Sequence, residues 1–302
     1  MIPSERLKGI EAFVTATDAG SFTAAAKRMN LTNSAVGKGV ARLEARLGTR
    51  LFDRTTRTLA LTDAGEAFYA TCVRVLAELA DAEGVLAAQR SEPFGRLKID
   101  VPVAFGRLQV LPLLLPFAEQ NANLRPVITF TDRFTDVIDE GIDVAVRIGG
   151  LNVLPSGLGR RYLGDEKLIF CASSDYLAKR GLPKSADDFT DYDCILYGRG
   201  DGSTIPWRFA DGSGSAVNRT MEGRIVLGSA EAQVAAVKAG FGVAQLATWL
   251  IKDELERGEL TEMMPELATK GLPLSLVWPR SRQLSPKVDA LLELLANGLR
   301  IE

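Results

Sequence analysis

Apolar residues recur at helical spacing in three short segments near the start of the chain. Residues 4–19 carry the first stripe, and Gly20 is expected to end that helix. Ser21 precedes the second stripe, at 22–29, and its hydroxyl can cap the free N–H groups of a helix. Thr32 or Asn33 can cap a third helix, which Gly48 would end. The apolar stripe of this third helix is Val36, Val40, Leu43 and Leu47.

The second and third helices are joined by only a few residues, which predicts a helix-turn-helix. The second helix of such a pair can enter the major groove with its N-terminal residues facing base edges. Asparagine can pair with adenine, and lysine can reach guanine or a phosphate. The candidate DNA-contacting residues on the two helices are Thr23, Thr32, Asn33, Ser34, Gly37, Lys38 and Arg42.

A small two-stranded wing is expected after these helices. Apolar ends at 51–52 and 59–61 enclose a polar basic tip. Arg54 and Arg57 in this tip can contact backbone phosphates or the minor groove. An alternative interpretation is a plain three-helix core whose residues Arg42, Glu44 and Arg46 form an ordinary solvated face.

From residue 63 to about 90 the apolar positions follow a heptad pattern, which predicts one long helix. This pattern favours the same helix of a second subunit as its partner, and a dimer would present two DNA-binding heads to two half-sites. The alternative is a helix packed on its own domain. Cys72 is expected to be a small core residue of this seam. The seam consists of Phe68, Cys72, Val75, Leu79, Ala82 and Leu86.

From residue 92 onwards, short strand and helix patterns alternate, which predicts a mostly parallel sheet with helices on both faces. Residues 102–107 are expected to be a loop that enters a helix at 110–121, and residues 134–140 a short helix. Two α/β subdomains joined by two crossovers would result, as in a periplasmic solute-binding protein. The first would comprise 95–163 and 268–302, and the second 164–267.

The residue words of the first segment, SFTAAAKRMNLTNSAVGKGVARLEARLGTRLFDRTTR and LTDAGEAFY, resemble the N-terminal domain of LysR-type transcriptional regulators. The words IDVPVAFGR, LPLLLPFAE, FTDRFTDVIDEGIDVAVRIG, AGFGVAQLATWL and VWPRSRQLSPKV resemble the effector-binding domain of the same family. The resemblance implies a regulator that binds double-stranded DNA and senses a small metabolite. It also implies a homodimer or homotetramer, with RNA polymerase as a further partner.

Departures from the family pattern, two in the third helix and one after the first strand of the effector domain, affect these expectations. Gly37 stands where the family usually has serine, and Gly39 is a second glycine in the same helix. Each glycine should cost about 1 kcal/mol relative to alanine in an exposed helix interior. Pro102 and Val103 stand where the family often has hydroxyl residues.

The fold class expected for the whole chain is α/β. It comprises an all-α winged helix-turn-helix at 1–62, a dimerising linker helix at 63–91, and an effector-binding domain at 92–302. The last is expected to resemble type 2 periplasmic-binding proteins. A length of 302 residues is consistent with two or three domains.

An effector is expected in the crevice outside the carboxyl ends of the strands. The resemblance points to Val103, Thr131 and Ser229 as lining residues, and Arg133 and Arg147 could hold a carboxylate such as that of an organic acid. Alternatively, Arg147 forms a structural ion pair with Asp132 or Asp143, and Tyr197 belongs to a packed loop. The candidate effector-binding residues are Val103, Ala104, Phe105, Thr131, Arg133, Arg147, Tyr197, Ser229 and Gln245.

Charge and composition sharpen this interpretation. The net charge is −2, but residues 1–60 hold ten Lys/Arg against five Asp/Glu, a net +5 that leaves −7 for the rest. A basic head on an acidic body suits docking on phosphates. Histidine is absent, which excludes Ser–His or Cys–His catalysis and histidine metal sites. The three cysteines show no CxxC spacing.

No signal peptide or membrane-length apolar run is present, so a cytoplasmic protein without a membrane partner is expected. No phosphate loop, nucleophile elbow or metal-ligand spacing indicates an enzyme, a metal or another cofactor. The competing hypothesis is a cytoplasmic small-molecule-binding protein whose N-terminal segment serves only for dimerisation.

Overall fold

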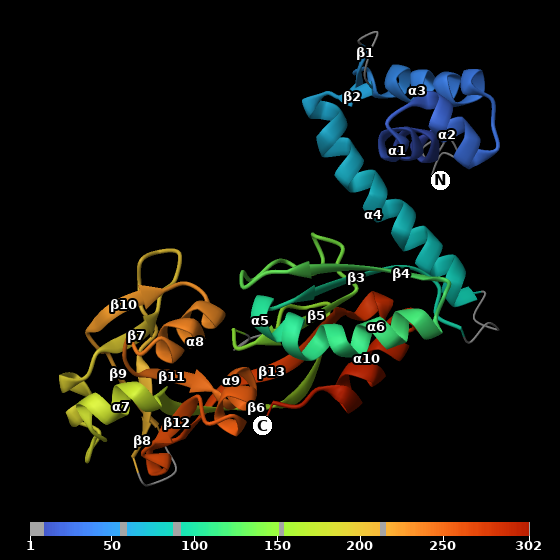
Figure 1. Ribbon diagram of the computed structural model, residues 1–302. Coiled ribbons are helices and arrows are strands. Elements are labelled where there is room, and N and C mark those ends of the chain that lie inside the picture. Colours follow the sequence, from blue (N-terminus) through green and yellow to red (C-terminus); the bar gives the residue numbers. More distant parts are fainter. Residues whose placement is uncertain (1–8, 55–58, 87–91, 151–153, 212–215, 302) are drawn as a thin grey trace. The chain divides into compact units, whose positions relative to one another are not determined.

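The computed structural model describes residues 9–54, 59–86, 92–150, 154–211 and 216–301. The chain divides into two compact units, residues 1–90 and 91–302 (Figure 1). Among the described helices, none combines the length and the apolar character needed to cross a membrane.

Unit 1 contains the expected helix-turn-helix and wing. Ser21 Oγ accepts a hydrogen bond from Ala24 N at 3.1 Å, and Thr32 Oγ1 accepts one from Ala35 N at 3.2 Å. Both N-caps are therefore confirmed, as is Gly48 with φ 69° at the end of the third helix. The elements are α1 (Ile10–Ala19), α2 (Phe22–Met29), α3 (Asn33–Leu47), β1 (Phe52–Arg54), β2 (Leu59–Leu61) and α4 (Asp63–Leu86).

The core of unit 1 forms around Phe13 of α1, whose side chain is fully buried and whose ring centroid lies 5.3 Å from that of Phe52. Val36, Val40 and Leu43 bury the inner face of α3, but Leu47 is 39% exposed, so the stripe ends one turn earlier than expected. Helix α3 also holds the wing. Its residue Glu44 accepts hydrogen bonds from the first wing residues, Leu51 N at 2.8 Å and Phe52 N at 3.2 Å.

The first half of α4 packs on its own unit. Cys72 is buried and Phe68 and Leu76 are partly buried against the same core, as the alternative interpretation of the seam held. Leu79 is 40% exposed. The side chains of Ala82 and Leu86 lie outside the described residues. Pairing of this helix with a second subunit stays a prediction.

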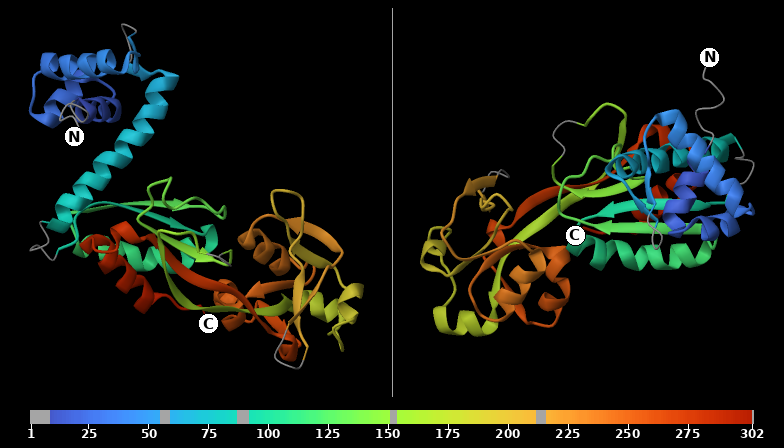
Figure 2. Two further views of the ribbon diagram at one scale, coloured as in Figure 1. Left: turned by 180° about the vertical axis from the view of Figure 1, so that it is seen from behind. Right: turned by 90° about the horizontal axis from the view of Figure 1, so that it is seen from above.

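Unit 2 is built on a seven-stranded sheet in the order β11-β6-β13-β5-β3-β4, with β12 also pairing with β6 (Figure 2). Strand β3 pairs in parallel with β4 and β5, but β6 and β13 make only antiparallel pairs in it. The sheet is thus mixed, and the mostly parallel expectation was wrong. Its strands are β3 (Gly95–Val101), β4 (Leu124–Phe130), β5 (Val144–Ile148), β6 (Leu158–Ser173), β11 (Ala244–Ala247), β12 (Leu260–Met263) and β13 (Thr269–Pro279).

The reason is that the two expected crossovers are themselves long strands, β6 and β13, which run in opposite directions beside one another (Figures 1 and 2). Their ladder is irregular between Lys270 and Pro273. Beside this irregularity the buried carboxylate of Glu166 accepts hydrogen bonds from Leu272 N at 3.2 Å and Trp249 Nε1 at 2.8 Å. The expected subdomain bounds stay a prediction.

The helix after β3 begins earlier than expected. It starts at Val103 as α5 (Val103–Phe105), continues through a π-helical turn, η1 (Gly106–Val110), and ends as α6 (Leu111–Gln120). The prediction of a loop at 102–107 was therefore wrong. Gly106 lets this helix lie against the sheet, because a Cβ there would approach Val101 Cγ2 to 2.2 Å.

The short helix expected at 134–140 was also wrong. This segment forms turns, in which Asp136 Oδ1 accepts hydrogen bonds from Ile138 N at 2.8 Å and Asp139 N at 3.0 Å. An aspartate side chain that bonds the backbone two and three residues ahead favours a turn over a helix.

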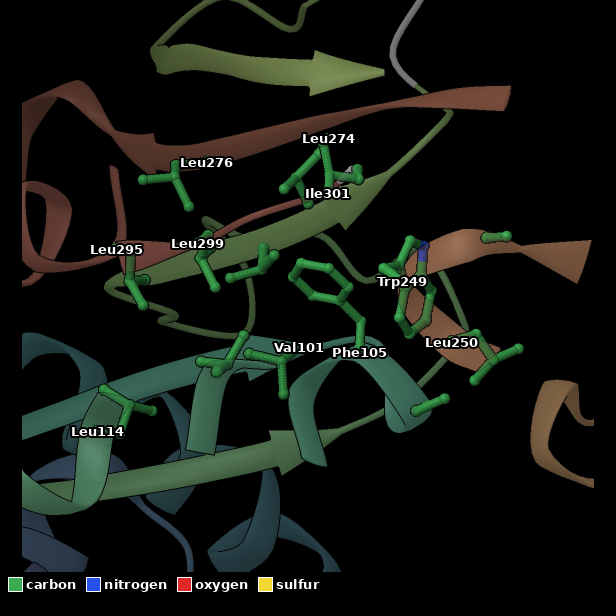
Figure 3. Packing of buried hydrophobic residues seen from close by; sticks show 14 of the residues in the cluster. Val101, Phe105, Leu114, Trp249, Leu250, Leu274, Leu276, Leu295, Leu299 and Ile301 are labelled. Carbon is green, nitrogen blue, oxygen red and sulfur yellow. The ribbon is translucent and has the colours of Figure 1, made fainter. Parts of the chain in front are cut away.

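The sequence pattern also predicts a helix at 174–180 and a strand at 194–197, and both form with these bounds, as Ser174–Arg180 and Cys194–Tyr197. The strand at Ala216–Arg219 was not expected. Strands β7 and β10 pair in parallel, and β8 pairs with β9. Around Phe105 and Trp249, apolar side chains from the sheet, α6, α9 and α10 form the main core (Figure 3). These elements are α7 (Ser174–Arg180), β7 (Cys194–Tyr197), β8 (Trp207–Ala210), β9 (Ala216–Arg219), β10 (Gly223–Leu227), α8 (Ala230–Lys238), α9 (Thr248–Glu256) and α10 (Pro286–Gly298).

Candidate DNA interface and effector-binding surface

The outer face of α3 is polar and open to solvent. Asn33 Nδ2 donates a hydrogen bond to Thr23 Oγ1 at 3.3 Å, which ties the start of α3 to the start of α2. Arg42 Nε donates to the Lys38 backbone oxygen at 3.3 Å, so these two cationic residues adjoin on one face. The exposed candidates are Thr23, Thr32, Asn33, Ser34, Lys38 and Arg42.

The two glycines of α3 have different surroundings. No heavy atom lies within 4 Å of a Cβ built on Gly37, whereas a Cβ on Gly39 would meet Ala12 Cβ of α1 at 3.5 Å. The backbone at Gly39 is covered closely, since a Cβ on Gly9 would lie 2.7 Å from its oxygen. Gly39 thus faces α1, and Gly37 lies on the open side of the helix.

Strand β1 brings Arg54 to the wing, where the backbone is described but the side chain is not. Arg57 lies outside the described residues.

In unit 2, the start of the helix after β3 lies against the loop that follows β4. Val103 N donates a hydrogen bond to Asp132 Oδ1 at 3.0 Å, and Val103 itself is 37% exposed. Thr131 Oγ1 accepts one from Arg133 N at 3.2 Å. Burial, and then the charge of Asp132, raise the pKa of Tyr197, which is the last residue of β7.

Arg147 is buried and its charge is already compensated. It forms an ion pair with Asp100, and its second nitrogen donates to Thr135 Oγ1 at 2.6 Å. A structural ion pair was the alternative considered, but the partner is neither Asp132 nor Asp143. Asp143 instead pairs with Arg282 at 2.7 Å. Sequence reasoning missed Asp100, although a carboxylate within the apolar strand LKIDV is a signal for a buried partner.

The other effector candidates have local partners. Ala104 and Phe105 are buried, and the Phe105 ring packs edge-on against Trp249 at 4.9 Å. The amide of Gln245 exchanges two hydrogen bonds with the backbone of Arg208, at 2.9 and 2.5 Å. Ser229 is exposed and caps α8. Val103, Thr131, Arg133, Tyr197 and Ser229 therefore keep solvent-accessible surface, while the remaining candidates serve packing or pairing.

The cysteines are all buried and unpaired as disulfides. Burial raises the pKa of Cys72 and Cys194 to about 11 and that of Cys171 further, so each thiol stays protonated at neutral pH. Within the described ranges, no group of three or more His, Cys, Asp or Glu residues is arranged to hold a metal ion.

Family models match both units. Residues 7–66 match the bacterial regulatory helix-turn-helix protein, lysR family, and residues 90–300 match the LysR substrate binding domain. The chain belongs to the LysR family of transcriptional regulators. Its order of elements, a helix-turn-helix head followed by an α/β effector domain, is that of this family.

LysR-family relatives match along nearly their whole length. An uncharacterized HTH-type transcriptional regulator of Haemophilus influenzae is 33% identical, over 95% of this chain and 98% of the relative. The HTH-type transcriptional regulator CrgA of Neisseria meningitidis is 30% identical, over 95% of both chains. The solved structure of CrgA covers 96% of this chain and 97% of its own, with a TM-score of 0.61 and 29% identity. This LysR-family protein is therefore a DNA-binding transcriptional regulator with an effector-binding domain.

Proposed function

We propose that this regulator inserts the exposed face of α3 into the major groove of its operator. The observation that carries the proposal is the contiguous polar face of Asn33, Ser34, Lys38 and Arg42, of which Asn33 is held by Thr23. Direct readout of bases needs such a face, with bonding groups on one side of a rigid helix. Arg54 and Arg57 would add phosphate contacts from the wing.

The DNA interface is tested by protection of DNA upstream of the protein's own gene and by gel-shift titration. Lys38→Ala and Arg42→Ala should each weaken operator binding by roughly tenfold, as losses of base or phosphate contacts do. Lys179→Ala, on exposed α7 of unit 2, removes the same charge away from α3 and serves as the control. Equal affinities of all three variants would contradict the proposal.

We propose that the working form is a homodimer or homotetramer in the bacterial cytoplasm, where the operator and RNA polymerase are present. Support comes from Leu79, an exposed apolar residue on α4 in heptad register with buried Cys72. Leu79→Glu should shift the mass measured by light scattering toward the monomer and lower operator affinity. Thr71→Glu, at an exposed position of the same helix, is the matched control. Unchanged mass in both variants would count against the pairing of α4.

We further propose that a small metabolite binds at Val103, Thr131, Arg133, Tyr197 and Ser229, with an organic acid as the class favoured by Arg133. Arg147 would act through Asp100 and Thr135 rather than by touching the ligand. Benzoate is a suitable probe for calorimetric titration. Arg133→Ala should weaken its binding several-fold, whereas Lys252→Ala on α9 should not. Equal binding by both variants would argue against a carboxylate at this surface.

A further inference from the structure

Unit 2 contains a cavity whose lining differs from the proposed effector surface. It has a volume of about 650 Å³ and opens between the π-helical turn η1 and helices α8 and α9. Its apolar lining includes Leu108, Val234, Trp249 and Leu250. The size lies within the range of small-molecule sites, which are typically apolar with a few polar groups. None of the effector candidates considered above lines it.

The walls of this cavity come from distant parts of unit 2 and are held together by contacts on both sides. Arg107 of the π-helical turn forms an ion pair with Glu231 of α8. Below it, Phe105 packs against Trp249 of α9 at 4.9 Å. π-helical turns inside longer helices occur often at functional sites. The cavity is therefore bordered by three separate elements, η1, α8 and α9, which contact one another around it.

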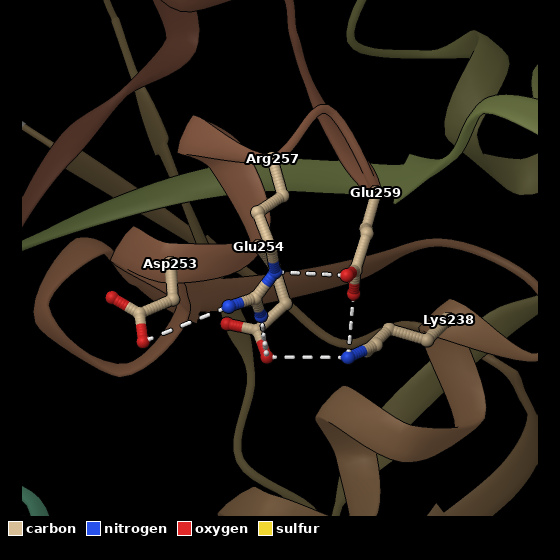
Figure 4. Close-up of polar contacts among 5 residues, drawn as sticks. All are labelled: Lys238, Asp253, Glu254, Arg257 and Glu259. Carbon is tan, nitrogen blue, oxygen red and sulfur yellow. Dashed lines mark hydrogen bonds and ion pairs between the residues drawn. The ribbon is translucent and has the colours of Figure 1, made fainter.

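One rim of the cavity carries an unbalanced charge cluster (Figure 4). Lys238 contacts Glu259 at 2.6 Å and Glu254 at 3.4 Å. Arg257 contacts Glu259 at 2.8 Å, Glu254 at 3.6 Å and Asp253 at 3.9 Å. Two cations thus serve three carboxylates. Hydrogen bonds from Lys238 and then Arg257 lower the pKa of Glu259, so this carboxylate stays ionised at neutral pH.

Asp253 is the carboxylate of this cluster that is best placed to pair with an added cation. Its single contact in this cluster is the longest, at 3.9 Å, and its side chain is 76% exposed. Asp253 and Glu254 both line the cavity, next to the apolar floor at Trp249 and Leu250. A ligand with one ammonium group would give each of the three carboxylates a cation, whereas an anionic ligand would increase the excess of negative charge. The attraction acts at short range and falls with added salt.

We propose that this cavity binds a primary amine with a single positive charge and an apolar, ring-sized body. The ammonium group would sit between Asp253 and Glu254, and the body would cover Trp249, Leu250 and Val234. This site is separate from the effector surface and would hold a different class of compound.

The test is calorimetric titration of the full chain carrying Arg133→Ala, which weakens the proposed carboxylate site and leaves the cavity lining intact, with phenethylamine, 2-phenylethanol and phenylacetate. The three compounds share a phenyl body and differ in charge. Phenethylamine should bind with a dissociation constant on the order of 1 mM or tighter, as expected for a ligand of this size. The alcohol should bind more weakly and the acid most weakly. Absence of saturable amine binding, or an acid that binds as well as the amine, would overturn the proposal.

Two variants locate the binding. Asp253→Asn should weaken phenethylamine binding by roughly two- to fivefold, the worth of an exposed charge pair, and leave the alcohol unchanged. Asp175→Asn, an exposed aspartate on α7, is the control. Ala235→Trp, on the exposed part of the lining, should block the amine and the alcohol but not benzoate. Amine binding that survives Ala235→Trp in a folded protein would place the amine elsewhere and overturn the assignment.

Discussion

Replacing Gly37 by alanine should stabilise unit 1 and weaken DNA binding at the same time. In the free protein the new methyl group meets nothing, because no heavy atom lies within 4 Å of a Cβ at this position. Alanine restricts the unfolded chain and is the better helix former, which is worth about 1 kcal/mol in a helix interior. For a unit of this size that gain corresponds to a rise of roughly 4–8 °C in Tm.

The effect on DNA binding follows from the position of Gly37 between Ser34 and Lys38 on the open side of α3. If the backbone there lies against the duplex, a methyl group adds bulk where none fits. Overpacking a closed interface costs about 1–3 kcal/mol, so operator affinity should fall by at least about fivefold. A stability gain and a binding loss from one methyl group are expected together only at a contact position.

Gly39→Ala separates the two effects. Its methyl group would make an ordinary contact with Ala12 at 3.5 Å, so the helix should be stabilised to a similar degree while affinity stays unchanged. Thermal unfolding followed by circular dichroism and gel-shift titration of the same preparations measure both quantities. Undiminished operator affinity in Gly37→Ala would refute the contact, and a lower Tm would refute the helix-propensity argument.

Three further predictions concern unit 2. Gly106→Ala should destabilise it by about 1–3 kcal/mol in urea unfolding, because the added Cβ would approach Val101 Cγ2 to 2.2 Å. Asp100→Ala should cost about 3–5 kcal/mol in the same measurement, because it leaves the charge of Arg147 buried without its partner. Glu166→Gln should flatten the dependence of stability on pH. Burial raises the pKa of Glu166 in the folded state, so its contribution is complete below the unfolded pKa of about 4.3 and is lost as pH rises through the folded pKa.

Each of these has a matched control on the surface. Gly200→Ala adds a Cβ with nothing within 4 Å and should be nearly neutral. Glu293→Ala removes an exposed ion pair with Arg161 and should cost under about 1 kcal/mol. Glu119→Gln changes an exposed carboxylate and should keep the wild-type pH profile. A variant that behaves like its control would contradict the corresponding argument.

Local signals in the sequence were enough for the second and third helices of the head. The first helix, expected at 4–19, begins only at Ile10, because Gly9 precedes it with φ 87°; residues 4–8 lie outside the described residues. Ser21 and Thr32 are N-caps in the structure because hydroxyl capping depends only on residues three positions apart. The same holds for Gly48, which adopts the left-handed conformation that ends α3. Elements whose start and end are coded by neighbouring residues were therefore placed correctly.

The predictions were wrong where contacts with distant residues, or competing local contacts, determine the conformation. The spacing at 134–140 is helical, but the Asp136 side chain captures the backbone N–H groups that a helix needs. The direction of β13 relative to β5 and β6 depends on tertiary pairing, which spacing does not encode. Likewise Arg147 was placed near a carboxylate, but its partner, Asp100, lies 47 residues earlier and on a different strand.

The paired strands β6 and β13 connect the two halves of the effector domain as one continuous hydrogen-bonded ribbon, which resists bending. Because one hydrogen-bonded ribbon runs through both halves, rotation of one half against the other has to bend or twist that ribbon. The deformation would concentrate where the strand pairing is irregular, at Gly271 and Leu272. At this point the carboxylate of Glu166 accepts a hydrogen bond from Leu272 N. Substitutions at Gly271 or Leu272 are therefore expected to change how easily the two halves rotate, and neither residue belongs to the proposed binding surfaces.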